Sequence, residues 1–487
     1  MGYDQKEGIR KRAFSGFFWR LFERIAAQGV QLLVSIILAR LLTPEDYGII
    51  ALITVFISIS TTIVGSGLGN ALIQKIDADQ TDFSSVFYVN MFLGVAMYGL
   101  LFAAAPLIAE FYHEAALTGV LRVLGLTLII SGINGVQRAY VSRHMQFKRF
   151  FYSTIIGTMI SALIGISMAY GGLGYWALVA QNLSNHCIDT LILWFTVRWR
   201  PIREFSFKRM KRLYSYGWKL LASSLLNTMY SNLFSLVVGK VYCSSDLAYY
   251  NRGNQIPALI TTNIDTSIQS VLLPVMSGVQ NDRTRLKAMV RRSITVSAFV
   301  MMPAMAGLAA VAEPLTRLLL TEKWLPCVPY MRISCFMYAL WSIHTSNLQA
   351  INAMGRSDIF LKLEILKSVL GMVVLLLTIP GGLRIMLAGM CLNSILATAI
   401  NAAPNRKFLN YRYMEQIRDI LPAAILSVAM GAAVWMISLL DLNLYAMLSV
   451  QILFGAAMYT GLAALFKMES FCYLIQTAKQ FRYKRSL

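Results

Sequence analysis

The sequence predicts an all-helical protein that crosses a membrane many times. Hydrophobic residues make up 57% of its 487 residues and charged residues only 14%, and the mean hydropathy is +0.59. Apolar runs of about twenty residues recur along the chain, and this is the length at which an α-helix spans the hydrocarbon core of a bilayer. The loops between the runs are short, which leaves no room for a separate catalytic domain on either side.

Fourteen runs can be delimited as membrane spans. They cover residues 17–42, 47–69, 84–110, 117–141, 150–170, 173–196, 213–240, 247–277, 293–313, 327–352, 360–380, 383–404, 419–440 and 444–466. The run at 247–277 is the most polar, so we expect one of its faces to be shielded from lipid. Because fourteen is even, both termini are expected on the same side of the membrane.

The net charge of +21 follows from this topology. With the N-terminus in the cytoplasm, most of the 44 Lys and Arg residues fall in cytoplasmic loops or at the termini, as the positive-inside rule expects. The distribution therefore predicts a multi-pass membrane protein with cytoplasmic N- and C-termini. The basic tail at 479–485 is expected to contact membrane lipids, and no nucleic-acid partner is needed to explain the charge.

The chain repeats itself at an offset near two hundred residues. Segment 40–47, RLLTPEDY, recurs in pattern as segment 240–247, KVYCSSDL. Further pairs are Trp19-Arg20 with Trp218-Lys219, Pro106-Leu107 with Pro314-Leu315, Arg122 with Arg332, and Gln137 with Gln349. The repeat predicts two pseudo-symmetric six-helix lobes, 1–212 and 213–404, followed by the last two spans and a basic cytoplasmic tail in 405–487. Two parallel repeats of this kind favour a substrate site between them.

Polar residues form a stripe on the first run. Arg20, Arg24, Gln28 and Gln31 are three or four residues apart, which places them on one face of a helix. The seventh run repeats this stripe with Lys219, Ser223, Asn227 and Tyr230. Because a charge that faces lipid at mid-depth costs at least about 2.5–3.5 kcal/mol, the stripes predict a wet interior. Snorkelling to the cytoplasmic surface remains an alternative for Arg20 and Lys219.

Cations outnumber acids among the charged residues within the spans. This excess predicts a cationic passage for an anionic substrate such as a phosphate, a pyrophosphate or an acidic sugar. The expected substrate-binding residues are Arg24, Gln28, Gln31, Arg122, Lys219, Asn227, Arg252 and Arg332. The candidates for ion coupling or gating are Glu23, Asp189 and Asp265. A structural ion pair or a helix cap is the alternative for each charged residue, and no motif indicates a metal, a cofactor or a catalytic centre.

Several segments together resemble a known family. The stretch ARLLTPEDYGIIALITVFISISTTIVGSGLGNALIQK (39–75), followed by FSSVFYVNMFLG (83–94), is similar to the polysaccharide transporter family. These are the Wzx-type lipid-linked oligosaccharide flippases of the MOP exporter superfamily, and the similarity is greatest to the colanic and teichuronic acid exporter branch. The segments YYNRGNQIP (249–257) and LLPVMSGVQND (272–282) fit the same family.

The resemblance implies a MOP/MATE-like fold with two six-helix lobes around a central cavity, and no enzymatic activity. It implies that an undecaprenyl-pyrophosphate-linked oligosaccharide crosses from the inner to the outer leaflet by alternating access. The exporter would then serve surface polysaccharide or lipopolysaccharide biosynthesis, with polysaccharide polymerase machinery as a further partner.

Three other classes remain open from the residues alone. A lipid-regulated channel is disfavoured by the two-lobe repeat and by the absence of a filter-like motif. A MATE-like multidrug or cation antiporter would need an acidic lining for cationic drugs, whereas the predicted lining is basic. A polytopic polysaccharide polymerase would need a sizeable external loop with catalytic residues, and the loops here are short.

Overall fold

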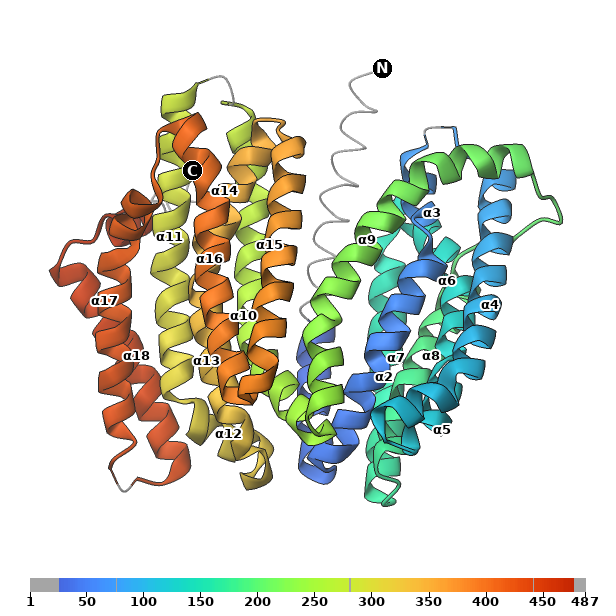
Figure 1. Ribbon diagram of the computed structural model, residues 1–487, viewed down its shortest axis with the longest axis horizontal. Helices are drawn as coiled ribbons and strands as arrows, with labels where there is room; N and C mark the ends of the chain where they lie inside the picture. Colours follow the sequence, from blue (N-terminus) through green and yellow to red (C-terminus); the bar gives the residue numbers. More distant parts are fainter. Residues whose placement is uncertain (1–25, 76, 280–281, 441, 477–487) are drawn as a thin grey trace, which may run out of the picture. The chain divides into compact units, whose positions relative to one another are not determined.

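The computed structural model describes residues 26–75, 77–279, 282–440 and 442–476 (Figure 1). These residues form α-helices and two short 3-10 helices. Each of the fourteen predicted spans coincides with one or two helices, and for the first span this holds over its described part, Ala26–Leu41. Among the described residues, nine helices are long and apolar enough to cross a membrane.

The chain forms two compact units, Met1–Ala248 and Tyr249–Leu487. Besides Ala26–Leu41, the first unit contains α2 (Pro44–Gly65), α3 (Leu68–Gln74), α4 (Gln80–Tyr112), α5 (Ala116–Leu124), α6 (Leu126–Arg143), α7 (Phe147–Tyr170), α8 (Tyr175–Thr196) and α9 (Phe207–Val241). Helix α10 (Ser244–Ser277) begins in the first unit and continues into the second.

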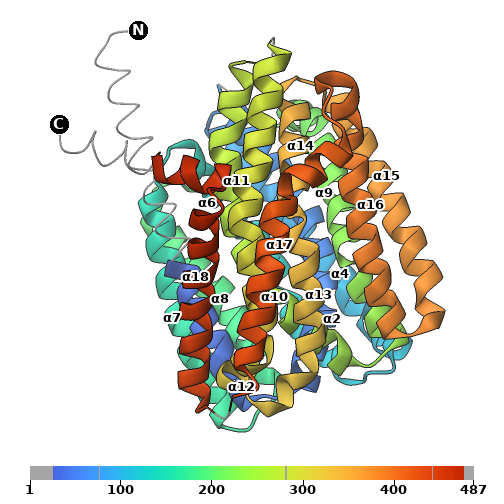
Figure 2. The ribbon, with the colours of Figure 1, turned by 90° about the vertical axis from the view of Figure 1, so that its left-hand side faces the viewer.

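The second unit contains the remaining helices. They are α11 (Arg283–Ala310), α12 (Ala312–Leu320), η1 (Glu322–Cys327), α13 (Val328–Ala339), α14 (Trp341–Ala353), α15 (Ser357–Thr378), η2 (Ile379–Gly381), α16 (Leu383–Leu409), α17 (Tyr413–Ile437) and α18 (Leu444–Leu465). Helix α17 packs along α11, and α18 packs against α17 (Figure 2).

The predicted span at 47–69 is broken into α2 and α3. Ser66 and Gly67, between the two helices, have positive φ angles of 46° and 68°. A Cβ atom on Gly67 would lie 2.4 Å from the carbonyl oxygen of Gly217 in α9. Glycine therefore satisfies both the left-handed backbone and the close approach of α9 at this point.

The spans at 117–141 and 327–352, which the repeat pairs, are both broken as well. The first divides at Gly125 into α5 and α6, and the second divides at Leu340 into α13 and α14. The other predicted pairs differ, because 47–69 is broken whereas 247–277 is the single helix α10.

The starts of α2 and α10, which the predicted repeat pairs, have a similar side-chain contact. The Thr43 hydroxyl and the Asp46 carboxylate form a capping box at α2, which satisfies backbone donors of the first turn. At α10 the Cys243 thiol donates to the Asp246 carboxylate over 3.1 Å. The two starts also touch, because the Ser245 hydroxyl donates to Glu45 over 3.0 Å.

The core of the first unit is rich in aromatic residues. Phe83 and Phe87 of α4 pack against Trp199, which is buried in the connection between α8 and α9. Helix α7 packs along α8 through small residues, and a Cβ atom on Gly157 would lie 3.5 Å from the backbone nitrogen of Asp189. This close packing fixes the position of Asp189 inside the unit.

Candidate functional site

The polar stripe of the first span is described only in part. Glu23 and Arg24 lie outside the described residues, whereas Gln28 and Gln31 lie in the helix Ala26–Leu41. Gln28 is half-buried and Gln31 is exposed.

The equivalent stripe on α9 is exposed. Lys219, Ser223 and Asn227 follow one another at intervals of four residues, and all three side chains are exposed. Another face of α9 packs on α2, where Thr228 and Thr62 form a hydrogen bond of 3.2 Å. Helix α9 therefore exposes these three polar residues over two helical turns, together with the apolar side chains of Leu226 and Met229.

Arg122 on α5 lies against an aromatic ring. Its guanidinium carbon is 4.3 Å from the ring centroid of Phe102 on α4, a cation–π contact. Its Nε atom is buried and has no hydrogen-bond partner among the described residues. Arg122 thus retains hydrogen-bonding capacity that its own unit does not use.

Asp189 on α8 is engaged in an ion pair. Its Oδ2 atom accepts a hydrogen bond of 3.0 Å from Asn134 and another of 3.0 Å from Arg138, both on α6. The Asp189 side chain is only 7% exposed, whereas Arg138 is 55% exposed. The carboxylate is therefore committed to Arg138 in this conformation.

The two predicted arginines of the second unit differ in their surroundings. Arg252 on α10 is 8% exposed, donates to Gln255 over 2.8 Å, and lies over the ring of Trp324 at 5.4 Å. Arg332 on α13 is exposed, and its Nε donates to the carbonyl oxygen of Ala309 over 3.3 Å. Arg252 thus packs α10 against η1, while Arg332 keeps most of its guanidinium accessible.

Asp265 on α10 begins a chain of side-chain hydrogen bonds. The half-buried carboxylate accepts from Gln269 over 2.7 Å, and Gln269 in turn accepts from Gln349 of α14 over 2.8 Å. These hydrogen bonds thus link α10 to α14. Within the described ranges, no group of three or more His, Cys, Asp or Glu residues could hold a metal ion.

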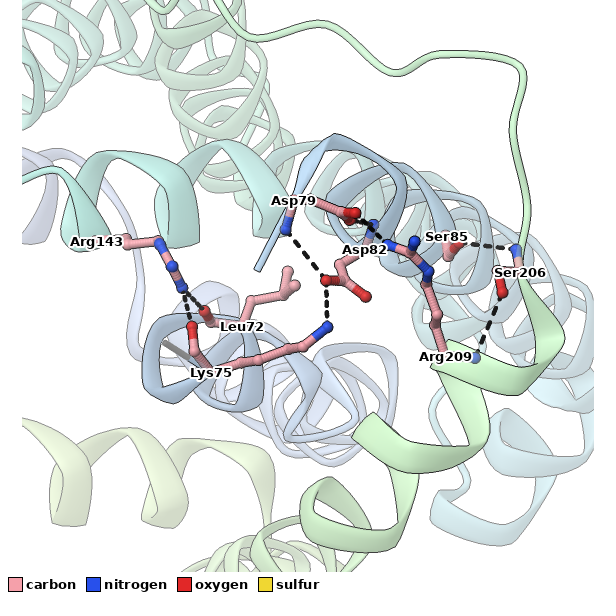
Figure 3. A network of polar contacts seen from close by, with 8 residues as sticks. All are labelled: Leu72, Lys75, Asp79, Asp82, Ser85, Arg143, Ser206 and Arg209. Atoms are coloured by element: carbon pink, nitrogen blue, oxygen red, sulfur yellow. Dashed lines mark hydrogen bonds and ion pairs between the residues drawn. The ribbon is translucent and has the colours of Figure 1, made fainter. Parts of the chain in front are cut away.

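A polar network that the sequence analysis did not identify lies where α3 meets α4 (Figure 3). The Lys75 ammonium is 2.5 Å from the carboxylate of Asp82, whose side chain is completely buried. Asp79 caps α4, and its backbone N–H also donates to Asp82 over 3.1 Å. Arg209 of α9 forms an ion pair with Asp79, and its hydrogen bond lowers the pKa of this carboxyl to about 2.

The connection between α8 and α9 is hydrogen-bonded to the first turns of α4. The hydroxyls of Ser84 and Ser85 accept from the backbone N–H groups of Ile202 and Ser206, over 3.0 Å and 3.1 Å. A sequence signal existed for part of this network, since Asp79 and Asp82 have the spacing of a capping box. The partners Lys75 and Arg209 carry no such signal.

Comparison with solved structures defines the class of this protein. The fold superposes on the lipid II flippase MurJ in an inward closed conformation with a TM-score of 0.74, at 14% identity, covering 93% of this chain and 98% of that chain. It also superposes on an inward-facing multidrug resistance MATE family transporter of the MOP superfamily with a TM-score of 0.64, at 15% identity, covering 81% and 98%. The predicted all-helical, MOP/MATE-like membrane fold is confirmed, and the protein is a multi-pass membrane protein of this architecture.

The family follows from the sequence. The profile of the family described as "polysaccharide biosynthesis protein" matches residues 37–329, more than half of the chain. The chain belongs to this family of Wzx-type polysaccharide biosynthesis transporters, and it is a transporter rather than an enzyme.

Curated relatives agree with this assignment. The chain is 22% identical to the lipopolysaccharide biosynthesis protein WzxC of Escherichia coli, over 87% of this chain and 88% of the relative. It is 23% identical to the teichuronic acid biosynthesis protein TuaB of Bacillus subtilis, over 72% and 73%. The succinoglycan biosynthesis transport protein ExoT of Rhizobium meliloti is 24% identical, over 63% and 62%.

Proposed function

We propose that the protein flips an undecaprenyl-pyrophosphate-linked oligosaccharide from the inner to the outer leaflet of the plasma membrane, for surface polysaccharide biosynthesis. Membership of the Wzx-type family supports a lipid-linked glycan as the substrate. WzxC, TuaB and ExoT are named for three different polysaccharides, so the proposal concerns lipid-linked glycans as a class.

The observation that carries the proposal is the exposed polar face of α9. Lys219 and Asn227 are exposed on a helix that is apolar enough to span a membrane. Such a face is costly against lipid and favourable against water or a polar head group. An ammonium group on this face attracts pyrophosphate oxygens through charge-assisted hydrogen bonds.

We place the other predicted substrate-binding residues along the same passage for the substrate. Gln31 and Arg332 are exposed, Gln28 is half-buried, and the Nε atom of Arg122 has no hydrogen-bond partner among the described residues. Arg24 belongs to the same stripe in the sequence, and Arg252 supports the helix that carries Asp265. In this proposal the lobes 1–212 and 213–404 alternate between two conformations during transport. The segment 405–487, with the last two spans and the tail, moves with them. Both termini are cytoplasmic.

Ion coupling in this proposal uses the intramembrane acids. Asp265 bonds to an amide rather than to a cation, which leaves its charge available to an ion. Asp189 could bind an ion only after its ion pair with Arg138 had broken. Glu23, which is adjacent to Arg24 in the sequence, would act as a gate. Polymerase machinery at the outer face would receive the flipped product.

The proposal is tested in liposomes that contain the purified protein. The assay measures how much undecaprenyl-pyrophosphate-linked oligosaccharide becomes accessible to an added glycosidase in the opposite leaflet. Lys219→Gln is expected to slow the transfer about 10- to 100-fold, the value of one charged hydrogen bond. Lys407→Gln, at an exposed lysine near the end of α16, is the matched control and should leave the rate unchanged.

Two results would overturn the proposal. One is a wild-type protein that transfers no lipid-linked glycan but expels a cationic dye, which indicates the antiporter class. The other is equal loss of activity in Lys219→Gln and Lys407→Gln, which removes the specific role of the α9 face.

A further inference from the structure

The polar stripe on α9 begins well before Lys219, in the first turns of the helix. Five polar residues follow one another at intervals of four, three, four and four residues, and they are Lys208, Arg212, Ser215, Lys219 and Ser223. These intervals place the side chains along one side of the helix, and all five are exposed. Two cations of the stripe therefore precede the one that carries the proposed function.

Lys208 and Arg212, the basic pair, lie outside the part of α9 that can span a membrane. That part is Gly217–Val241, and four of the six cations of α9 precede it. Trp218, at its start, is 46% exposed, and tryptophan favours the boundary between hydrocarbon and water. This order places the basic pair at the membrane surface and Lys219 just inside the span.

The first turns of α9 are held firmly on the first unit. Met210 and Leu213 are 8% and 5% exposed and belong to the aromatic-rich core of this unit. The connection that precedes α9 is hydrogen-bonded to α4, and the first turns of α9 cross the top of the unit in Figure 1. The basic pair therefore stands on a fixed support, so that a ligand loses little affinity to the ordering of backbone.

The charges of the basic pair are not neutralised within the described part of the chain. Neither side chain forms an ion pair or a hydrogen bond with another described residue. Asp79 is paired with Arg209, and Glu204 accepts from the hydroxyl of Thr81 over 2.8 Å. Lys211 is a further exposed cation beside the pair. Uncompensated cations at a membrane surface attract the anionic head group of a lipid.

The spacing of the basic pair suits a pyrophosphate. Residues four apart on a helix have Cβ atoms about 5–6 Å apart, so these two long side chains can converge on one head group. The arginine fork binds phosphate oxygens bidentately, and lysine adds a second positive charge. A pyrophosphate presents two adjacent phosphates to the two cations, whereas the phosphodiester of a common anionic phospholipid carries a single negative charge.

We propose that the basic pair is a loading site, where the pyrophosphate head group of a lipid binds at the membrane surface before it reaches Lys219. That this lipid is the transported substrate rests on the proposed flippase function. The donors along the stripe are about 4.5–6 Å apart in height, because each residue of an α-helix rises 1.5 Å. A head group can therefore bind Ser215 and Lys219 before it leaves the basic pair.

Native mass spectrometry of the purified protein tests the loading site without transport, with undecaprenyl pyrophosphate as the ligand. Lys208→Gln/Arg212→Gln should weaken binding roughly 30-fold, since each basic residue near a membrane surface contributes a factor of about 5. Lys208→Arg/Arg212→Lys keeps both charges and should retain most of the affinity. The matched control, Arg406→Gln/Lys407→Gln, removes two exposed cations of α16 and should bind like the wild type.

Transfer kinetics in liposomes separate the basic pair from Lys219. Lys208→Gln/Arg212→Gln should raise the half-saturating concentration of the lipid-linked oligosaccharide and leave the maximal rate unchanged, because the pair acts before the head group enters the span. Lys219→Gln should instead lower the maximal rate. A double variant that lowers the maximal rate at an unchanged half-saturating concentration would contradict a loading role.

The outcomes distinguish the loading site from the function. Equal binding of undecaprenyl pyrophosphate by the wild type and the double variant refutes the site, and so does its displacement by equimolar phosphatidylglycerol, which indicates a general anionic-lipid surface. If the double variant fails to fold, Lys208→Gln alone replaces it, and affinity equal to that of the wild type refutes the site. Loss of binding in the variant, with no transfer by the wild type, refutes the flippase proposal and leaves the pyrophosphate site standing.

Discussion

Replacement of Lys75 by methionine is expected to destabilise the first unit strongly. The substitution removes the cation that lies 2.5 Å from Asp82, and the Asp82 side chain is completely buried. Its Oδ1 atom already has no hydrogen-bond partner among the described residues. Removal of one partner from a buried ion pair costs about 3–5 kcal/mol, and the 18% exposure of Lys75 places the expected loss near the lower value.

The assay is thermal unfolding of the protein in detergent. A domain of this size loses roughly 2–4 °C in Tm per kcal/mol, so Lys75→Met should lower the Tm of the first unit by about 6–12 °C. A second replacement, Asp82→Asn, removes the buried charge while its amide oxygen can still accept from Asp79. The double variant Lys75→Met/Asp82→Asn should therefore recover more than half of the loss.

Arg209→Met is the matched control, because it also removes a cation from an aspartate in this network. Its partner Asp79 is 48% exposed, and solvent screens such a surface pair, so Arg209→Met should lower the Tm much less than Lys75→Met does. Equal losses of Tm in Lys75→Met and Arg209→Met would refute the reasoning that burial decides the strength of these two pairs.

Two further predictions concern the first unit. A Cβ atom on Gly48 would lie 2.1 Å from the carbonyl oxygen of Ser244, so Gly48→Ala should cost at least about 1–3 kcal/mol in thermal unfolding. Gly65→Ala, where no atom lies within 4 Å, should cost nothing, and a similar loss in both would contradict the contact. The second prediction concerns pH. Because Arg209 lowers the pKa of Asp79 from 3.8 to about 2, the stability from this pair is present above pH 4 and is lost as the pH falls through 2. The difference in Tm between wild type and Arg209→Met should therefore be constant from pH 8 to 5, begin to narrow below pH 4 and close as the pH falls through 2. A difference that already closes at pH 6 would exclude this pair as its source.

The helices could be predicted from the sequence because a bilayer imposes a length and a polarity on each span. The broken spans were harder to predict, since Leu340 has no glycine or proline beside it that would indicate an interruption. Gly67 is different, because Gly65, Gly67 and Gly69 lie close together in the sequence and a cluster of glycines is a signal for an interruption.

The polar contacts were mostly beyond sequence reasoning. Lys75 and Asp82 are separated by a turn between two helices, and Gln269 and Gln349 are 80 residues apart. Pairs of this kind depend on how helices pack, and periodicity within one helix does not report it. The stripe on α9 could be predicted because its residues lie on one face of a single helix, and helical periodicity alone places them there.

The contact between Glu45 and Ser245 joins the first turns of α2 and α10. Both residues belong to the first unit, whereas most of α10 belongs to the second. The hydrogen bond therefore holds the start of α10 on α2, so a movement of the rest of α10 would pivot about a first turn that is fixed in the first unit.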